Sequence, residues 1–213
     1  MRRIGITGGI GSGKSVVSRL LRIMGYSVYD TDSEAKRLME SSLEVVQKLS
    51  ECFGRDIYHN GRLNRGLLSS RVFGESDKIV LLNSIVHPVV RFDFYRWSES
   101  LNEEICFVES AILYESRFDE LVDEVWTVTA PEELRISRVR QRSGLTEEEI
   151  KKRMAAQLSE EEKQRRAAHI IWNDGNVSVI HRVLSLLKSL EWEFFVLKTV
   201  KPDKNIIFVV RMI

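Results

Sequence analysis

The chain has 213 residues, of which 43% are hydrophobic, and this is enough to bury one sizeable core in one compact unit. Its 32 basic and 31 acidic residues give a formal net charge of +1, which excludes the strongly basic class of proteins that coat nucleic acid. Any recognition of an anion must therefore be local.

Cysteine usage and the distribution of apolar residues favour a cytoplasmic protein. Cys52 and Cys106 lie far apart and form no CxxC pair, so they predict free thiols in a reducing compartment. The first residues, "MRRIGITGG", run into glycines instead of the apolar stretch of a secretory signal. No window approaches the roughly 18 apolar residues of a membrane helix. We therefore expect no membrane partner.

The first quarter of the chain predicts a strand, a glycine loop and a helix, followed by a second strand. "RIGIT" at 3–7 is a short β-branched run, and the helical spacing at 16–24 ends at Gly25. The second strand, 26–32, ends in two aspartates. Residues 33–54 then predict two short helices.

The next segment, 55–103, contains no convincing pair of strands. It reads as mainly helical, punctuated by Gly61, Gly66, Gly74 and Pro88. We therefore expect an all-helical insert over about residues 35–103.

Strands resume after this insert. "ICFVES" at 105–110 and "EVWTVTA" at 124–130 are continuous apolar runs, typical of strands buried on both faces. Pro131 and Gly144 bound a helix between them, and "HIIW" at 169–172 predicts a last core strand. Strand and helix thus alternate as in a three-layer α/β fold with a parallel sheet.

Three more helices are indicated near the end of the chain. Capping boxes at 146–149 and 159–162 predict helices at about 147–157 and 160–168. The segment 177–190 is amphipathic and predicts a third.

The last residues, 191–213, have a sequence pattern different from that of the helical segment before them. Two β-rich runs flank a turn at 201–205, which predicts a hairpin. A hairpin packed on the core, an intermolecular strand and a disordered extension all remain open.

The glycine loop "GGIGSGKS" at 8–15 has the full P-loop pattern, in the required position between a strand and a helix. Without side chains, its N–H groups can turn inward around phosphate, aided by the positive end of the helix dipole. Lys14 would reach the β- and γ-phosphates, and the Ser15 hydroxyl would bind Mg²⁺. We expect the phosphates of a nucleotide to bind Gly9, Gly11, Ser12, Gly13, Lys14, Ser15 and Val16, a pattern that by itself fits an ATPase, a GTPase switch or a kinase.

Three acidic residues lie at the ends of predicted strands, at the sheet edge where open α/β folds bind ligands. Glu109 ends a strand beside the loop and is a candidate magnesium ligand. Asp32 is the candidate general base that accepts the proton of an attacking hydroxyl, with Asp30 in support, since residues two apart in an extended segment point the same way.

Arginines gather in "RISRVRQR". Arg138 and Arg142 are four residues apart and share a helix face, with Arg135 adjacent and Arg140 on the opposite side. Arginine stabilises charge on a transferring phosphoryl group with bidentate geometry, so Arg138 and Arg142 are candidate catalytic residues. The histidines His59, His87, His169 and His181 lack metal-ligand spacing and are interpreted as structural.

These residues together indicate a small-molecule kinase. Another kinase of the same fold, acting on a nucleoside monophosphate or a sugar, is the nearest alternative. A GTP-dependent switch is disfavoured because the chain lacks the guanine-reading Asn/Thr-Lys-x-Asp pattern.

Several blocks, in order over about residues 3–185, resemble the dephospho-CoA kinase family. They are "GITGGIGSGKS", "DTD", "NGRLNRGLLSSRVF", "LNSIVHP", "ESAILYES", "APEELRISRVRQRSG", "KRMAAQLSEEEK" and "IIWNDG". The resemblance implies transfer of the ATP γ-phosphoryl group to the ribose 3′-hydroxyl of dephospho-CoA, the last step of coenzyme A synthesis.

The resemblance also implies a P-loop kinase fold with a parallel five-stranded sheet, a helical CoA-binding insert and a helical lid. The nucleotide-binding core would comprise 1–34, 104–139 and 168–190. The CoA lobe would comprise 35–103 and the lid 140–167, leaving 191–213 as an extension of unknown role. The small-molecule substrate is the expected partner, with no nucleic acid, and the protein would be a monomer or a weak homo-oligomer.

Residue by residue, Asp32 matches the family's proposed base, and Arg138 and Arg142 match arginines near the phosphates. Gln157 and Lys163 fall in the lid motif. The chain departs from the family pattern in having Glu109 for aspartate, Ala111 for proline, Arg135 for glutamine and His169 for aspartate. Glutamate can still serve the metal, at one methylene's greater reach.

Overall fold

The structure is a computed structural model that describes residues 1–199, with side chains described for residues 1–190. Its centre is a parallel five-stranded sheet with the order β2-β5-β1-β6-β7. All five core strands predicted from the sequence are present. They are β1 (Arg2–Thr7), β2 (Val28–Asp30), β5 (Ile105–Glu109), β6 (Glu124–Thr129) and β7 (His169–Trp172).

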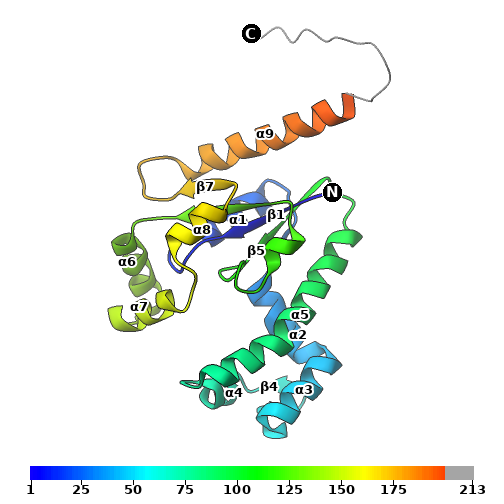
Figure 1. The fold of residues 1–213 in the computed structure, drawn as a ribbon, viewed down its shortest axis with the longest axis vertical. Helices are drawn as coiled ribbons and strands as arrows, with labels where there is room; N and C mark the ends of the chain where they lie inside the picture. Colours follow the sequence, from blue (N-terminus) through cyan, green and yellow to red (C-terminus); the bar gives the residue numbers. More distant parts are fainter. Residues whose placement is uncertain (200–213) are drawn as a thin grey trace.

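Helices cover both faces of this sheet and make the three predicted layers. On one face, α1 (Lys14–Ile23) and α9 (Val179–Thr199) pack on alternate strand residues such as Ile4 and Ile6, which are fully buried. On the other face, Val108 of β5 belongs to a second apolar cluster shared with the helical insert. Figure 1 shows α9 on one side of the sheet and the insert on the other.

The insert consists mainly of α2 (Thr31–Ser41), α3 (Leu43–Phe53), α4 (Arg65–Val72) and α5 (Ser76–Ser100). Gly66 and Pro88 lie inside α4 and α5, so these two residues do not interrupt helices as the sequence suggested. Short 3₁₀ turns lie at Arg55–Ile57 and Phe118–Leu121.

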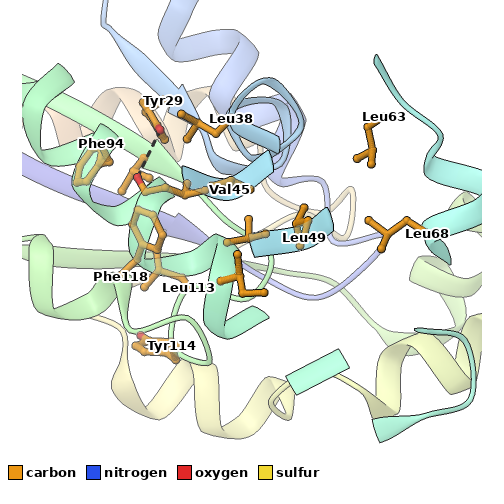
Figure 2. Close-up of a cluster of buried hydrophobic side chains, with 14 of the residues drawn as sticks. Tyr29, Leu38, Val45, Leu49, Leu63, Leu68, Phe94, Leu113, Tyr114 and Phe118 are labelled. Atoms are coloured by element: carbon orange, nitrogen blue, oxygen red, sulfur yellow. Dashed lines mark hydrogen bonds between the residues drawn. The ribbon is translucent and has the colours of Figure 1, made fainter. Parts of the chain in front are cut away.

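The second apolar cluster joins the insert to the sheet. Tyr29 of β2 packs edge-on against Phe94 of α5 with ring centroids 5.3 Å apart, and Phe94 also contacts Phe118. Figure 2 shows these rings in one cluster with Leu38 and Leu49, which come from α2 and α3. The insert is therefore anchored to the sheet by shared burial.

The prediction that 55–103 holds no pair of strands is wrong. A small hairpin joins β3 (Tyr58–His59) to β4 (Arg62–Leu63). Its two turn residues, Asn60 and Gly61, have φ values of 50° and 75°, and this left-handed pair is the geometry that Asn-Gly favours in a two-residue hairpin.

The predicted helices after β6 are confirmed. They are α6 (Glu132–Ser143), α7 (Glu147–Ala155) and α8 (Glu160–Arg166). Gly144 ends α6 at a φ of 67°, and Thr146 caps α7 in a complete capping box.

The first part of the predicted C-terminal hairpin is wrong. Residues up to Thr199 continue α9 as helix, because no glycine or proline interrupts the run before Pro202. The remainder of the predicted hairpin, 200–213, lies outside the described residues. Within the described part of the chain, no helix combines the length and the apolar character needed to cross a bilayer.

We expect Tyr29→Phe to lower the free energy of unfolding by about 1–2 kcal/mol. The Tyr29 hydroxyl donates to Asp93 Oδ2 at 2.7 Å, and Asp93 keeps its ion pair with Arg37 when that hydroxyl is lost. Urea unfolding measures the change. The matched control is Tyr95→Phe, on the same helix as Asp93 at an exposed position, which should shift the midpoint very little. Equal shifts in both variants would contradict this account.

Candidate active site

The glycine loop between β1 and α1 needs its glycines for two separate reasons. Gly8, Gly11 and Gly13 have φ values of 145°, 80° and 100°, which side chains rarely tolerate. A Cβ at these positions would also collide with Val128, Arg135 and Asn173, respectively. The loop is thus pressed between β6, α6 and the turn after β7.

The loop amides divide into two groups. Gly9 N–H donates to Glu160 Oε1 at 2.8 Å, and Ile10 N–H donates to Gln157 Oε1 at 3.0 Å. Ser12 N–H donates to the Gly9 carbonyl at 3.1 Å. Among the described residues, the structure gives no protein acceptor to the amides of Gly11, Gly13, Lys14 and Ser15.

Three residues of the expected phosphate site make other contacts in the structure. Gly9 and Ser12 use their amides within the protein, and Val16 N–H donates to Gly13 O at 3.0 Å while its side chain is exposed. None of the three lines the cavity in front of the loop. The amides left available are those at the N-terminus of α1, where the helix dipole favours an anion.

A cavity of about 600 Å³ lies in front of these amides. It brings together groups from the loop, from the carboxyl edge of the sheet and from the segment 140–167, which we predict to be a lid. The charged residues that line it are Lys14, Arg22, Asp30, Asp32, Lys36, Glu109, Arg138 and Arg142.

Lys14 and Glu109 perturb each other inside this cavity. Burial lowers the pKa of Lys14, and the nearby carboxylates of Glu109 and Asp32 oppose that shift. Burial also raises the pKa of Glu109, against the effect of the Lys14 ammonium. Strand register sets Glu109 opposite Asp30 at the end of β5.

Asp30 and Asp32 play different structural parts, and the prediction of an extended 30–32 segment is wrong. Asp30 caps α2: its Oδ1 accepts the N–H groups of Asp32 and Ser33 at 3.0 and 3.3 Å, and its Oδ2 accepts the Ser33 hydroxyl at 2.8 Å. Asp32 lies in the first turn of α2. Within the described residues its carboxylate accepts no hydrogen bond, so it is available to a ligand in the cavity.

The arginines of α6 separate as the helix spacing predicts. Arg138 and Arg142 both line the cavity, and Arg138 Nη2 donates to the Asn173 carbonyl at 2.8 Å. Arg140 does not line it. Arg135 is 6% exposed and turns instead toward Glu160 of α8.

Sequence reasoning missed Arg22 and Lys36, which also line the cavity. Lys36 follows Asp32 by four residues on α2, and Arg22 follows Ser15 by seven on α1. Both spacings keep residues on one helix face, so helix periodicity would have found them.

Two residues of the predicted lid motif and one of the histidines have different surroundings. Gln157 lines the cavity, whereas Lys163 is fully buried and its Nζ donates to the Ala111 carbonyl at 3.3 Å. His169 packs edge-on against Trp126, with ring centroids 6.2 Å apart. Among the described residues, no cluster of three His, Cys, Asp or Glu side chains suits a metal held by protein alone.

A second, mostly apolar cavity of about 190 Å³ begins at Asp32 and runs between α2, α5 and the segment after β5. It is lined by residues that include Met39, Val86, His87 and Phe118. Burial lowers the pKa of His87, with a smaller contribution from Arg91, so its imidazole favours the neutral form.

The comparisons with known proteins point to one family. Residues 2–178 match the family model described as dephospho-CoA kinase. The dephospho-CoA kinase of Porphyromonas gingivalis is 40% identical over 89% of this chain and 95% of the relative, and that of Bacteroides fragilis is 41% identical over 88% and 92%.

Solved structures support the same fold. TT1252 from Thermus thermophilus superposes with a TM-score of 0.75 at 36% identity, covering 90% of this chain and 97% of that one. A dephospho-CoA kinase from Campylobacter jejuni gives 0.69 at 23% identity, over 91% of this chain and 100% of that one, and so shows the fold alone. The parallel sheet, the P-loop at its edge and the family match identify the chain as a kinase that belongs to the dephospho-CoA kinase family.

Proposed function

We propose that this chain transfers the γ-phosphoryl group of ATP to the ribose 3′-hydroxyl of dephospho-CoA, giving CoA and ADP. Family membership supports the substrates. The observation that carries the mechanism is the shared cavity: the free loop amides, Lys14 and the unoccupied Asp32 carboxylate all face one space of about 600 Å³. An alcohol and a triphosphate can therefore meet there.

The nucleotide phosphates bind at the N-terminus of α1. The amides of Gly11, Gly13, Lys14 and Ser15 donate to phosphate oxygens, and the Lys14 ammonium neutralises charge on the β- and γ-phosphates. Because these donors are held by the folded loop, they need no reorganisation when charge moves toward the leaving ADP.

Asp32 acts as the general base. It accepts the proton of the 3′-hydroxyl while the hydroxyl oxygen bonds to the γ-phosphorus and the bond to the bridging oxygen of ADP breaks. Asp30, whose carboxylate is committed to capping α2, holds that helix and hence Asp32 in place. The adjoining apolar cavity, with His87 in its wall, receives part of the acceptor beyond the reacting ribose.

Mg²⁺ fits the oxygen ligands that this cavity provides. The Ser15 hydroxyl and the Glu109 carboxylate are hard donors, and a magnesium ion held by few protein groups commonly completes its shell with phosphate oxygens and water. When bound, the ion draws electron density from the phosphate oxygens and so stabilises the charge of the transition state.

The other segments of the chain have separate roles in this proposal. Residues 1–34, 104–139 and 168–190 form the nucleotide core, and 35–103 form the lobe that binds the acceptor. Residues 140–167 act as a lid that excludes water, while Arg138 and Arg142 stabilise the transferring group. The two free thiols, one exposed and one buried, are consistent with action in the reducing cytoplasm. The proposed active unit is a monomer or a weak homo-oligomer.

A coupled assay of ADP release tests the function. Dephospho-CoA should give turnover well above the ATPase background, whereas a panel of nucleoside monophosphates and sugars should not. Faster turnover with any member of that panel would mean that dephospho-CoA is not the preferred acceptor. ADP release at the same rate with and without an acceptor would contradict kinase activity.

We expect Glu109→Gln to raise the Mg²⁺ concentration needed for half-maximal activity by about tenfold, since a neutral amide binds the ion less well than a carboxylate. The KM for dephospho-CoA should stay constant. Titrating Mg²⁺ at saturating substrates measures this change. An unaltered Mg²⁺ requirement would assign the ligand role to another residue.

A further inference from the structure

The start of the glycine loop is held by the lid. Gln157, just after α7, accepts the Ile10 N–H, and Glu160, the first residue of α8, accepts the Gly9 N–H. These are contacts across about 150 positions of sequence, and they use the two amides that precede the phosphate-facing ones.

Glu160 is the centre of a buried junction. Its side chain is 14% exposed, its Oε2 accepts the Thr129 hydroxyl at 2.9 Å, and its Oε1 lies 3.4 Å from Arg135 Nη1. One carboxylate therefore joins the lid to the loop, to the end of β6 and to α6.

Arg135 serves this junction and does not line the cavity. Its side chain is 7% exposed, so the charge of Glu160 is balanced inside the protein. The packing at the loop is tight: a Cβ on Gly9 would collide with both Glu160 Oε1 and Arg135 Nη1. Gly9 does not have a positive φ, so this lack of space is what calls for glycine there.

We propose that Glu160 and Arg135 are positioning residues for ATP: their ion pair fixes the Gly9 peptide, and with it the orientation of the loop amides from Gly11 to Ser15. The phosphate site is then complete only while α8 is docked on the loop. This inference deepens the proposed function, because it concerns how the same phosphate site is formed.

The physical basis is the short path between the two groups of amides. Only Ile10 separates the Gly9 peptide from the first free amide, at Gly11, so a rotation at Gly9 is transmitted directly to the phosphate donors. A carboxylate holds an N–H more strongly than a neutral oxygen does, and the cost of losing one partner is greatest where the other stays buried.

The test compares Glu160→Ala, Glu160→Gln and Arg135→Met with a matched control, Glu161→Ala. Glu161 is the next residue of α8, is exposed, and carries the same charge. We expect the dissociation constant of ATP, measured by calorimetry, to rise about tenfold for Glu160→Ala and less for Glu160→Gln, whose amide oxygen still accepts the Gly9 N–H. Glu161→Ala should match the wild type.

Two further readouts separate positioning from general destabilisation. In the Glu160 and Arg135 variants, the KM for ATP should rise while the KM for dephospho-CoA stays constant. Hydrogen exchange of the Gly9 and Ile10 amides, followed by NMR, should be faster in these variants than in the wild type. Gly9→Ala, which displaces the same carboxylate from the loop side, should reproduce the weaker ATP binding. The double variant Glu160→Gln with Arg135→Met should lose less ATP-binding free energy than the sum of the losses in the two single variants.

Unchanged ATP affinity in Glu160→Ala, or an equal loss in Glu161→Ala, would overturn the inference. Should Glu160→Ala not fold, Glu160→Gln and Arg135→Met give the same comparison with less change in volume. Calorimetry and exchange need no acceptor, so they report on positioning even if dephospho-CoA proves not to be the substrate.

Discussion

Lys14→Ala should lower kcat by on the order of 10²–10³, because it removes the cation that faces the β- and γ-phosphates from inside the loop. The ammonium interacts with the carboxylates of Glu109 and Asp32 in the same cavity, so its loss leaves phosphate charge beside two acids with less positive charge to balance it. Initial rates of ADP release at saturating substrates measure the effect.

The control for this change is Lys48→Ala. Lys48 is an exposed lysine on α3, and it forms an ion pair with Glu44, four residues before it on the same helix. Such surface ion pairs contribute little to the free energy of unfolding. Its kcat should equal that of the wild type. A drop of less than tenfold in Lys14→Ala would mean that another cation of the cavity, such as Arg138, carries the stabilisation.

Asp32→Asn should lower kcat by on the order of 10² or more, since an amide has nearly the same shape as the carboxylate but cannot accept the proton of the acceptor hydroxyl. The KM for ATP should change little, because the loop amides and Lys14 are untouched. Steady-state kinetics with dephospho-CoA, together with urea unfolding to confirm an intact fold, provide the measurement.

Asp30→Asn makes the informative comparison. Asparagine is also a good helix N-cap, so this variant should keep α2 and lose less than tenfold in kcat. A larger loss for Asp30→Asn than for Asp32→Asn would show that the wrong aspartate has been assigned as the base.

Most of the core could be predicted from the sequence because its signals are local. The apolar run at 105–110 and the glycine after α6 mark where a strand and a helix stop, and the structure confirms both as β5 and α6. The P-loop is recognisable for the same reason: its residues are contiguous.

The errors came where a local pattern allowed two structures. Asp30 ends a strand but also caps the next helix, and the cap converts an extended segment into the first turn of α2. The apolar run after Leu190 has strand-forming residues, yet no helix-breaking residue separates it from α9.

The junction at Glu160 could not be predicted, because nothing local connects a glutamate in a capping pattern with the amide of Gly9. Only the folded chain brings them together. Arg135 illustrates the same limit: its helix spacing placed it near the phosphate arginines, whereas burial turned it toward Glu160.

The position of Asp32 on α2 has a mechanical consequence. That helix begins directly after β2 and packs against α3 and α5, so the proposed base lies where the sheet meets the lobe that we expect to bind CoA, whereas Lys14 belongs to α1. The alignment of this carboxylate with the γ-phosphorus therefore depends on how the lobe packs on the sheet.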